Sequence, residues 1–182
     1  MLVLCRRVMA GLLLLAGIIV SLSAAAQTWT DVVAPDLRFK LEMPAPVDRG
    51  TVNEKESSYA GPRTVYQAAL NGQNFDFDHI DYRPDFASLQ NSKEMVLDLG
   101  RGAVEKAFPK DKFKYVRDEA LVIEGWDGYA LDVESEKGDG VMMRTYLVKN
   151  RLYRLLVSYA ADDASKDAAK RFVDSFKVSE TR

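Results

Sequence analysis

The run of residues 144–159, RTYLVKNRLYRLLVSY, constrains the fold more than any other part of this 182-residue chain. Its apolar side chains recur with the period of two that is typical of strands, and Asn tolerates the left-handed backbone of a tight turn. We therefore predict two antiparallel strands joined at Asn150-Arg151. A two-residue loop there would place Val148 opposite Tyr153, Tyr146 opposite Leu155 and Arg144 opposite Val157.

One face of this hairpin is apolar except for Arg144, whereas the other face mixes apolar and charged residues. An antiparallel sheet that packs one face on a core has this asymmetry. The run therefore predicts a sheet with one buried face, and it carries no catalytic signature.

The first 26 residues have the three parts of an export signal. These are the basic pair Arg6-Arg7, an apolar run from Val8 to Leu22, and three small residues at 24–26. We predict cleavage after residue 26, a single domain over residues 27–182, and a periplasmic or secreted location. The apolar run is shorter than the roughly 20 residues that a spanning helix needs, so we expect no stable membrane span after cleavage. A retained anchor is the alternative.

The only cysteine, Cys5, lies before the apolar run, so the domain beyond residue 26 can form no internal disulfide. A chain of its 156 residues buries roughly 70% of its unfolded surface, which is enough for one core without covalent links. That domain has 23 basic and 27 acidic residues, a net charge of −4, because the first 26 residues contain two of the 25 basic residues and none of the acidic ones. An acidic balance without a basic block argues against nucleic acid as a partner.

Alternation, turn residues and helical spacing predict the other elements in order. A hairpin turns at Asn71-Gly72, Ser88 is the expected N-cap of a helix, and residues 27–36 are expected to be a loosely held lead-in. The expected fold class is α+β, with a central antiparallel sheet and flanking helices. The predicted ranges are a strand over 37–43, hairpin strands over 63–70 and 74–82, a helix over 88–107, strands over 112–125 and 129–137, and a helix over 163–175.

The connection between the two strands after the first helix has two possible registers. A three-residue loop at Trp126-Asp127-Gly128 would align Leu121 and Ile123 with Leu131 and Val133, whereas a two-residue loop would align Val122 and Glu124 with them. We favour the three-residue loop, because a slip of one residue would expose the apolar set.

Several short runs resemble the PsbP-like proteins, which are exported bacterial domains mostly of unknown function. These runs are a strand ending in proline (FKLEMP), a GWDG turn, the basic-aromatic hairpin of residues 144–159 and a terminal RFVDSF, and the likeness covers residues 37–178. The resemblance implies an α/β/α sandwich and an accessory or partner-binding role rather than an established enzyme. It transfers no functional residue, because a fold does not assign a function.

A concentration of polar residues in the predicted strand NFDFDHIDY suggests one candidate site. His79 and Asp81 point to the same side of that strand, and an imidazole with a carboxylate suits a metal ion or proton transfer. Because His79 is the only histidine, a histidine-rich zinc or copper site within one chain is excluded. The alternative is an ordinary solvated strand face.

A second candidate set for binding is Trp126, Tyr129 and Arg144. The two aromatic residues, with Trp29, could form a binding rim at the strand ends, and Arg144 lies on an otherwise apolar face. A guanidinium is always charged and offers a planar fork of donors to an anionic ligand or partner. The alternatives are that the aromatic rings cover a core edge, and that the arginine head reaches water or an acid such as Asp132 or Glu134.

Enzyme signatures are missing from the sequence, which has no Gly-x-Ser-x-Gly motif and no glycine-rich phosphate loop. We therefore expect an exported, soluble, non-catalytic accessory or protein-binding module without a cofactor. Its expected partner is another envelope protein or a small ligand, and not nucleic acid. The alternative function is a periplasmic carrier of a small ligand or a metal.

Overall fold

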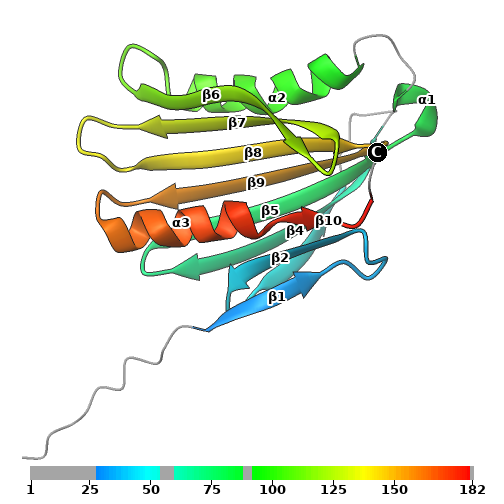
Figure 1. Ribbon diagram of the computed structural model, residues 1–182, viewed down its shortest axis with the longest axis horizontal. Coiled ribbons are helices and arrows are strands. Elements are labelled where there is room, and N and C mark those ends of the chain that lie inside the picture. The colour runs from blue at the N-terminus through cyan, green and yellow to red at the C-terminus, as the bar shows by residue number, and fades with distance from the viewer. Residues whose placement is uncertain (1–27, 54–59, 88–91, 181–182) are drawn as a thin grey trace, which may run out of the picture.

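A computed structural model of the chain describes residues 28–53, 60–87 and 92–180 (Figure 1). Its strands form two antiparallel sheets, a small sheet in the order β1-β2-β10 and a large sheet in the order β3-β4-β5-β9-β8-β7-β6. No helix in this described part of the chain is both long and apolar enough to cross a membrane. The strands are β1 (Trp29–Val33), β2 (Phe39–Pro44), β3 (Asp48–Val52), β4 (Ala60–Leu70), β5 (Gln73–Tyr82), β6 (Lys114–Ile123), β7 (Trp126–Glu134), β8 (Gly140–Val148), β9 (Arg151–Tyr159) and β10 (Lys177–Val178), and the helices are α1 (Pro84–Ala87), α2 (Ser92–Ala107) and α3 (Asp163–Ser175).

The predicted fold class, an α+β protein built as an α/β/α sandwich, is wrong. The fold is β-rich, because residues expected to be a loose lead-in form β1 and pair with β2, and β10 pairs with the other edge of β2. The apolar side of β2, with Phe39, Leu41 and Met43 fully buried, packs against the large sheet. Strands therefore supply much of the layer that the prediction assigned to helices.

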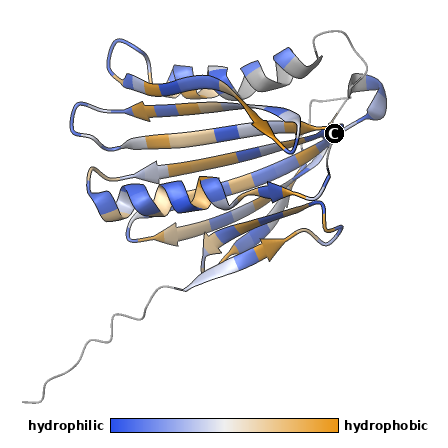
Figure 2. Cartoon of the chain, in the orientation of Figure 1, coloured by the Kyte–Doolittle hydropathy of each residue, from blue (hydrophilic) through white to orange (hydrophobic). Residues whose placement is uncertain are grey.

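The core lies between the small sheet with α3 and one face of the large sheet, which we call the core face. Its largest fully buried side chains include Phe39 on β2, Phe77 on β5, Tyr153 on β9 and Phe172 on α3. The helix over 163–175 is confirmed, and the carboxylate of Asp162 caps it by accepting the amide of Ser165 at 2.8 Å. Figure 2 shows the alternation of apolar and polar positions along these strands.

The opposite face of the large sheet, which we call the α2 face, is covered only in part. Val104 of α2 packs on Leu131, Val133 and Met143, which belong to β7 and β8. The predicted N-cap, Ser88, lies outside the described residues. Beside α2, strands β9, β5, β4 and β3 present this face to a groove rather than to a second helix.

The hairpin turns decide which residues reach each face. The Asn71-Gly72 turn is confirmed, with backbone φ values of 49° and 81° that suit these two residue types. The turn between β8 and β9 is Lys149-Asn150 rather than Asn150-Arg151, so Val148 pairs with Arg151 and the predicted register is wrong by two residues. An even shift leaves every side chain on its predicted face. Asn150 is drawn into the turn because its side-chain amide donates to the carbonyl of Tyr82 at 2.6 Å.

The favoured three-residue loop between β6 and β7 is also wrong. The turn is Glu124-Gly125, with φ values of 47° and 82°, and Ile123 pairs directly with Trp126. Glycine supplies the left-handed conformation that this two-residue turn requires. Leu121 consequently pairs with Gly128, and it does not share a face with Leu131.

Candidate functional site

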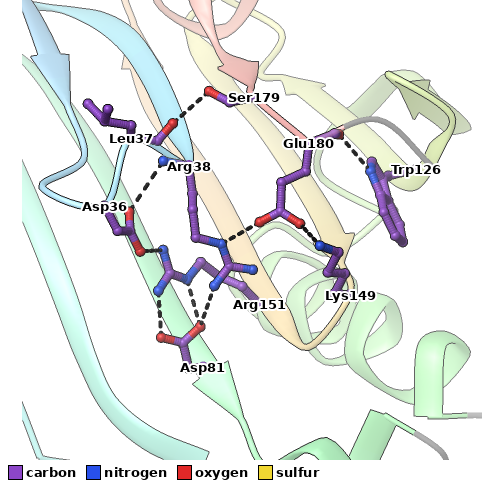
Figure 3. Close-up of polar contacts among 9 residues, drawn as sticks. All are labelled: Asp36, Leu37, Arg38, Asp81, Trp126, Lys149, Arg151, Ser179 and Glu180. Atoms are coloured by element: carbon purple, nitrogen blue, oxygen red, sulfur yellow. Dashed lines mark hydrogen bonds and ion pairs between the residues drawn. The ribbon is translucent and has the colours of Figure 1, made fainter.

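A charged network lies at one end of the large sheet, where β5 ends and β9 begins (Figure 3). Its centre is Arg151, whose side chain is only 8% exposed. The guanidinium donates to both carboxylate oxygens of Asp81, at 2.6 and 2.7 Å, and to Asp36 at 2.8 Å. One buried cation is thereby held between two carboxylates from the β1–β2 connection and from β5.

The network continues to the C-terminal segment through Glu180. Arg38 donates to Oε1 of Glu180 at 2.6 Å and lies 3.7 Å from Asp81, and Lys149 forms an ion pair with Oε2 of Glu180. The indole N–H of Trp126 donates to the main-chain carbonyl of Glu180 at 2.8 Å. These side chains come from five separate parts of the chain: the β1–β2 connection, β5, the start of β7, the β8–β9 turn and the segment after β10 (Figure 3).

The electrostatics of the network stabilise its charged forms. Burial by itself would raise the pKa of Asp81 and of Asp36, but the hydrogen bond and charge of Arg151 outweigh it and hold both values below the ordinary range. The hydrogen bond from Lys149 lowers the pKa of Glu180 in the same way. The three carboxylates therefore stay ionised well into the acid range.

His79 lies next to this network on the core face, within an aromatic cluster. Its ring is 5.4 Å from that of Phe39 and 6.2 Å from that of Tyr153. Burial lowers its pKa to about 4, and the charge of Arg151 acts in the same direction. Its Nδ1 atom is buried and has no hydrogen-bond partner among the described residues. At neutral pH His79 is thus an uncharged ring in an apolar setting.

The metal prediction placed His79 and Asp81 together. The two residues do share the network region, but the carboxylate of Asp81 is engaged by Arg151. Within the described ranges, no group of three or more His, Cys, Asp or Glu residues could hold a metal ion. Metal binding at this pair stays a prediction.

The second predicted set is not brought together. Trp126 and Tyr129 are an odd number of positions apart on β7, so their side chains point to opposite faces of the sheet. Trp126 points to the core face and Tyr129 to the α2 face. The Arg101 guanidinium lies 5.6 Å from the centre of the Tyr129 ring. Arg144 is buried on the core face, where it forms a two-pronged ion pair with Asp132 and donates to the carbonyl of Met143 at 2.8 Å. Only Trp126 of these three reaches the charged network.

The α2 face carries a groove of about 550 Å³ between α2 and β3. Polar side chains on its floor bond to one another: Arg154 donates to Asp78 at 2.8 and 3.1 Å, and Gln67 donates to Asp76 at 2.6 Å. The floor also has an open apolar position, Leu156, which is 37% exposed. The groove is lined by Asp48, Arg49, Gly50, Thr51, Val52, Arg63, Val65, Gln67, Asp76, Asp78, Ala103, Val104, Met143, Arg154 and Leu156.

Sequence reasoning missed both the network and the groove. Arg151 was placed in a turn, and its partner Asp36 was placed in a lead-in, so nothing linked the two. The groove had a usable signal, because Asp76 and Asp78 alternate with buried phenylalanines on β5 and Arg154 lies on the mixed face of the 144–159 run. That pattern indicates a sheet face left open to solvent.

Comparison with known proteins shows the fold. No family model matches the sequence, and no curated protein matches it. The solution structure of cyanobacterial PsbP (CyanoP) from Synechocystis sp. PCC 6803 is similar, with a TM-score of 0.55 and 14% identity over 86% of this chain and 95% of that one. The expected PsbP-like fold is therefore confirmed, although the helical sandwich expected with it is not.

Two further solved structures overlap more loosely. A protein of unknown function from Pseudomonas aeruginosa, described as a putative regulator, has a TM-score of 0.33 and 12% identity over 78% of this chain and 88% of that one. A Bacteroides thetaiotaomicron protein has a TM-score of 0.40 and 10% identity, and the match covers 82% of this chain and 48% of that one.

Proposed function

We propose that this protein is an exported, non-catalytic accessory module that binds an extended segment of another envelope protein in the groove of the α2 face. The PsbP-like fold supports an accessory role, and the N-terminal signal pattern supports export to the periplasm or beyond. The observation that carries the proposal is the groove itself, which combines open apolar surface with charges that are already paired.

The chemistry of the groove favours a protein segment over a small charged substrate. Asp78 is held by Arg154 and lies 3.6 Å from Arg63, so neither sign of charge dominates the floor. Apolar contacts come from Val65, Met143 and Leu156 on three different strands. Neutralised pairs among apolar positions resemble the composition of a protein interface, which has apolar contacts within a polar surround.

The edge strand β3 supplies the second part of the fit. All five residues from Asp48 to Val52 are exposed, and all five line the groove. In the described part of the chain, β3 pairs with β4 alone and forms the end of the large sheet. Its outer edge therefore presents backbone N–H and C=O groups that an added strand can pair with, while side chains of that strand reach the groove.

Site-specific photo-crosslinking in cells of the native host tests this proposal. A benzoylphenylalanine in place of Asp48, which pairs on β3 with the groove residue Gln67, is compared with one in place of Val116, which is 53% exposed on β6 at the other end of the large sheet. We expect one specific protein to be linked at Asp48 and not at Val116. The same products at both positions, or no product at Asp48, would contradict the proposal.

Export is tested by the mass of the protein isolated from its host. Cleavage after Ala26 gives the mass of residues 27–182, and fractionation of the cells then places that form in the periplasm or the medium. A protein that keeps residues 1–26 and sediments with membranes would instead support a retained anchor.

A further inference from the structure

The segment Lys177–Glu180 lies across the end of the large sheet and is held mainly by residues far away in the sequence (Figure 3). Ser179 donates its amide to the carbonyl of Arg38 at 3.1 Å and its hydroxyl to the carbonyl of Leu37 at 2.6 Å. These bonds keep Ser179 extended beside the β1–β2 connection, directly after the buried Val178. The extended backbone brings the next residue, Glu180, over three side chains.

Arg38, Trp126 and Lys149 together hold one acidic residue, Glu180. Arg38 and Lys149 each contact one oxygen of the Glu180 carboxylate, and the Trp126 indole N–H donates to the main-chain carbonyl of the same residue. The three side chains come from the β1–β2 connection, the start of β7 and the β8–β9 turn. Together they bind both the negative charge of the carboxylate and the main-chain carbonyl of the same residue, which is more specific than a single ion pair.

The contacts to Glu180 are suited to exchange. Lys149 is 58% exposed, and the segment beyond Val178 has no apolar anchor in its described part. Water competes for the charge of the exposed Lys149, and no apolar side chain of their own holds the described residues 179–180. Glu180, whose side chain is 20% exposed, can therefore leave its site while Phe176 and Val178 stay buried. Its departure leaves Lys149 without this carboxylate and Arg38 with Asp81 at 3.7 Å, and an added carboxylate is then attracted to the site.

We infer that the Arg38–Trp126–Lys149 site is a docking site for an acidic, extended segment of a partner protein, and that Glu180 occupies it as an internal competitor. The occupant's chemistry follows from the residue seated there, an acidic side chain on an extended backbone. A tethered competitor acts at an effective concentration of about millimolar, so the full chain binds such a segment weakly until the tail is displaced. This site is separate from the groove and does not depend on it.

Complementation with the chain's own tail tests the inference. The probe is the peptide acetyl-Ser-Glu-Thr-Arg-amide, which copies residues 179–182, added to a chain that ends at Val178. The chain has only two tryptophans, so the indole N–H resonance of Trp126 is assigned by loss of the other signal in Trp29→Phe. We expect the peptide to return the Trp126 resonance toward its full-chain position, with at least tenfold weaker binding to the full chain.

Three controls make the outcome decisive. The peptide acetyl-Ser-Gln-Thr-Arg-amide should bind the shortened chain at least tenfold more weakly, and Lys149→Gln should have the same effect. In the full chain, Glu180→Gln should open the site to the glutamate peptide without shortening the protein. A folded shortened chain that gives no Trp126 shift at millimolar peptide, or that binds both peptides equally, would overturn the inference. Crosslinking at Asp48 should be unchanged by Glu180→Gln, so failure here and failure of the groove proposal are distinguishable.

Discussion

The two faces of the large sheet come from the same strands but have opposite roles. On the core face, the small sheet and α3 bury nearly every side chain of β5 and β9, including Phe77 and Tyr153. On the α2 face, one helix covers β7 and β8, while Asp78, Arg154 and Leu156 line an open groove. The difference shows that the larger apolar core lies on the core face, whereas part of the α2 face stays open to solvent.

The largest expected effect comes from emptying the core face. Phe77→Ala removes a fully buried ring that lies 4.7 Å from that of Phe39, and should lower the free energy of unfolding by about 3–5 kcal/mol. Leu156→Ala, on the α2 face of β9, should cost less than about 1 kcal/mol because its side chain is already partly in water. Urea titrations of both variants measure the contrast, and equal losses would contradict the division between the faces.

The charged network at the sheet end should rank second. Arg151→Met leaves Asp81 and Asp36 without their buried partner, but both carboxylates still reach solvent, so the expected loss is about 1–2 kcal/mol. The matched control is Arg83→Met, because Arg83 makes a similar two-pronged contact to Asp85 on the exposed surface. That control should cost less than about 0.5 kcal/mol. Thermal or urea unfolding compares the two, and an equal loss would argue that the network adds no stability.

The pH dependence of stability separates His79 from the network. The pKa of His79 in the folded protein is about 4, below the ordinary value of 6.5. Between these two pH values the imidazole is protonated in the unfolded chain but not in the folded one, so the free energy of unfolding falls as the pH drops from 6.5 to 4. The steepest expected slope is about 1.4 kcal/mol per pH unit. His79→Phe, which keeps a ring in the aromatic cluster, should flatten the profile in that window. An unchanged slope in the variant would show that His79 is not the group that titrates.

The carboxylates act in a lower window with the same sign. The folded pKa values of Asp36, Asp81 and Glu180 are held below their unfolded values, so their contribution is complete above the unfolded pKa and is lost as the pH falls through the folded one. Arg151→Met should therefore remove stability at pH 7 and reduce the loss below about pH 4. Urea unfolding midpoints of the variant and the unmodified protein at pH 7 and pH 3 measure both effects.

The smallest expected effect on stability comes from the α2 face, where the proposed groove predicts a large effect on binding. Val52→Lys, at a position 42% exposed on β3, should change the free energy of unfolding by less than about 0.5 kcal/mol. It should also reduce partner crosslinking at the groove at least tenfold, because the added charge lies beside open apolar surface. Val116→Lys, at the exposed valine on β6, should change neither quantity. Equal crosslinking in both variants would show that the partner does not bind at the groove.

Local patterns predicted the elements that depend on nearby residues. The hairpin at Asn71-Gly72 and the helix over 163–175 were predicted correctly, because turn chemistry and helix capping act over a few positions. The 144–159 run was placed on the correct faces, although its register was wrong by two residues. An error of two is invisible to an alternation argument, since it keeps every side chain on its face.

Predictions that needed distant partners failed. The β6–β7 turn was misplaced because the apolar set was assumed to share one face, whereas Val122 is exposed and Leu121 points to the core face beside Gly128. The second sheet was missed because residues 29–33 become a strand only when β2 offers an edge to pair with. Strand formation depends on such pairing more than on intrinsic preference.

The sequence by itself determined the Asn71-Gly72 turn, the alternating faces of the 144–159 run and the terminal helix, because each follows from the chemistry of neighbouring residues. Only the tertiary structure decided which functional side chains meet. Arg38 and Glu180 are 142 positions apart, and Arg151 is 115 from Asp36 and 70 from Asp81. In the sequence alone, nothing distinguishes any of these charged residues from an ordinary surface residue. Their contacts arise because sheet pairing brings distant strand ends together, and no short-range pattern encodes that meeting.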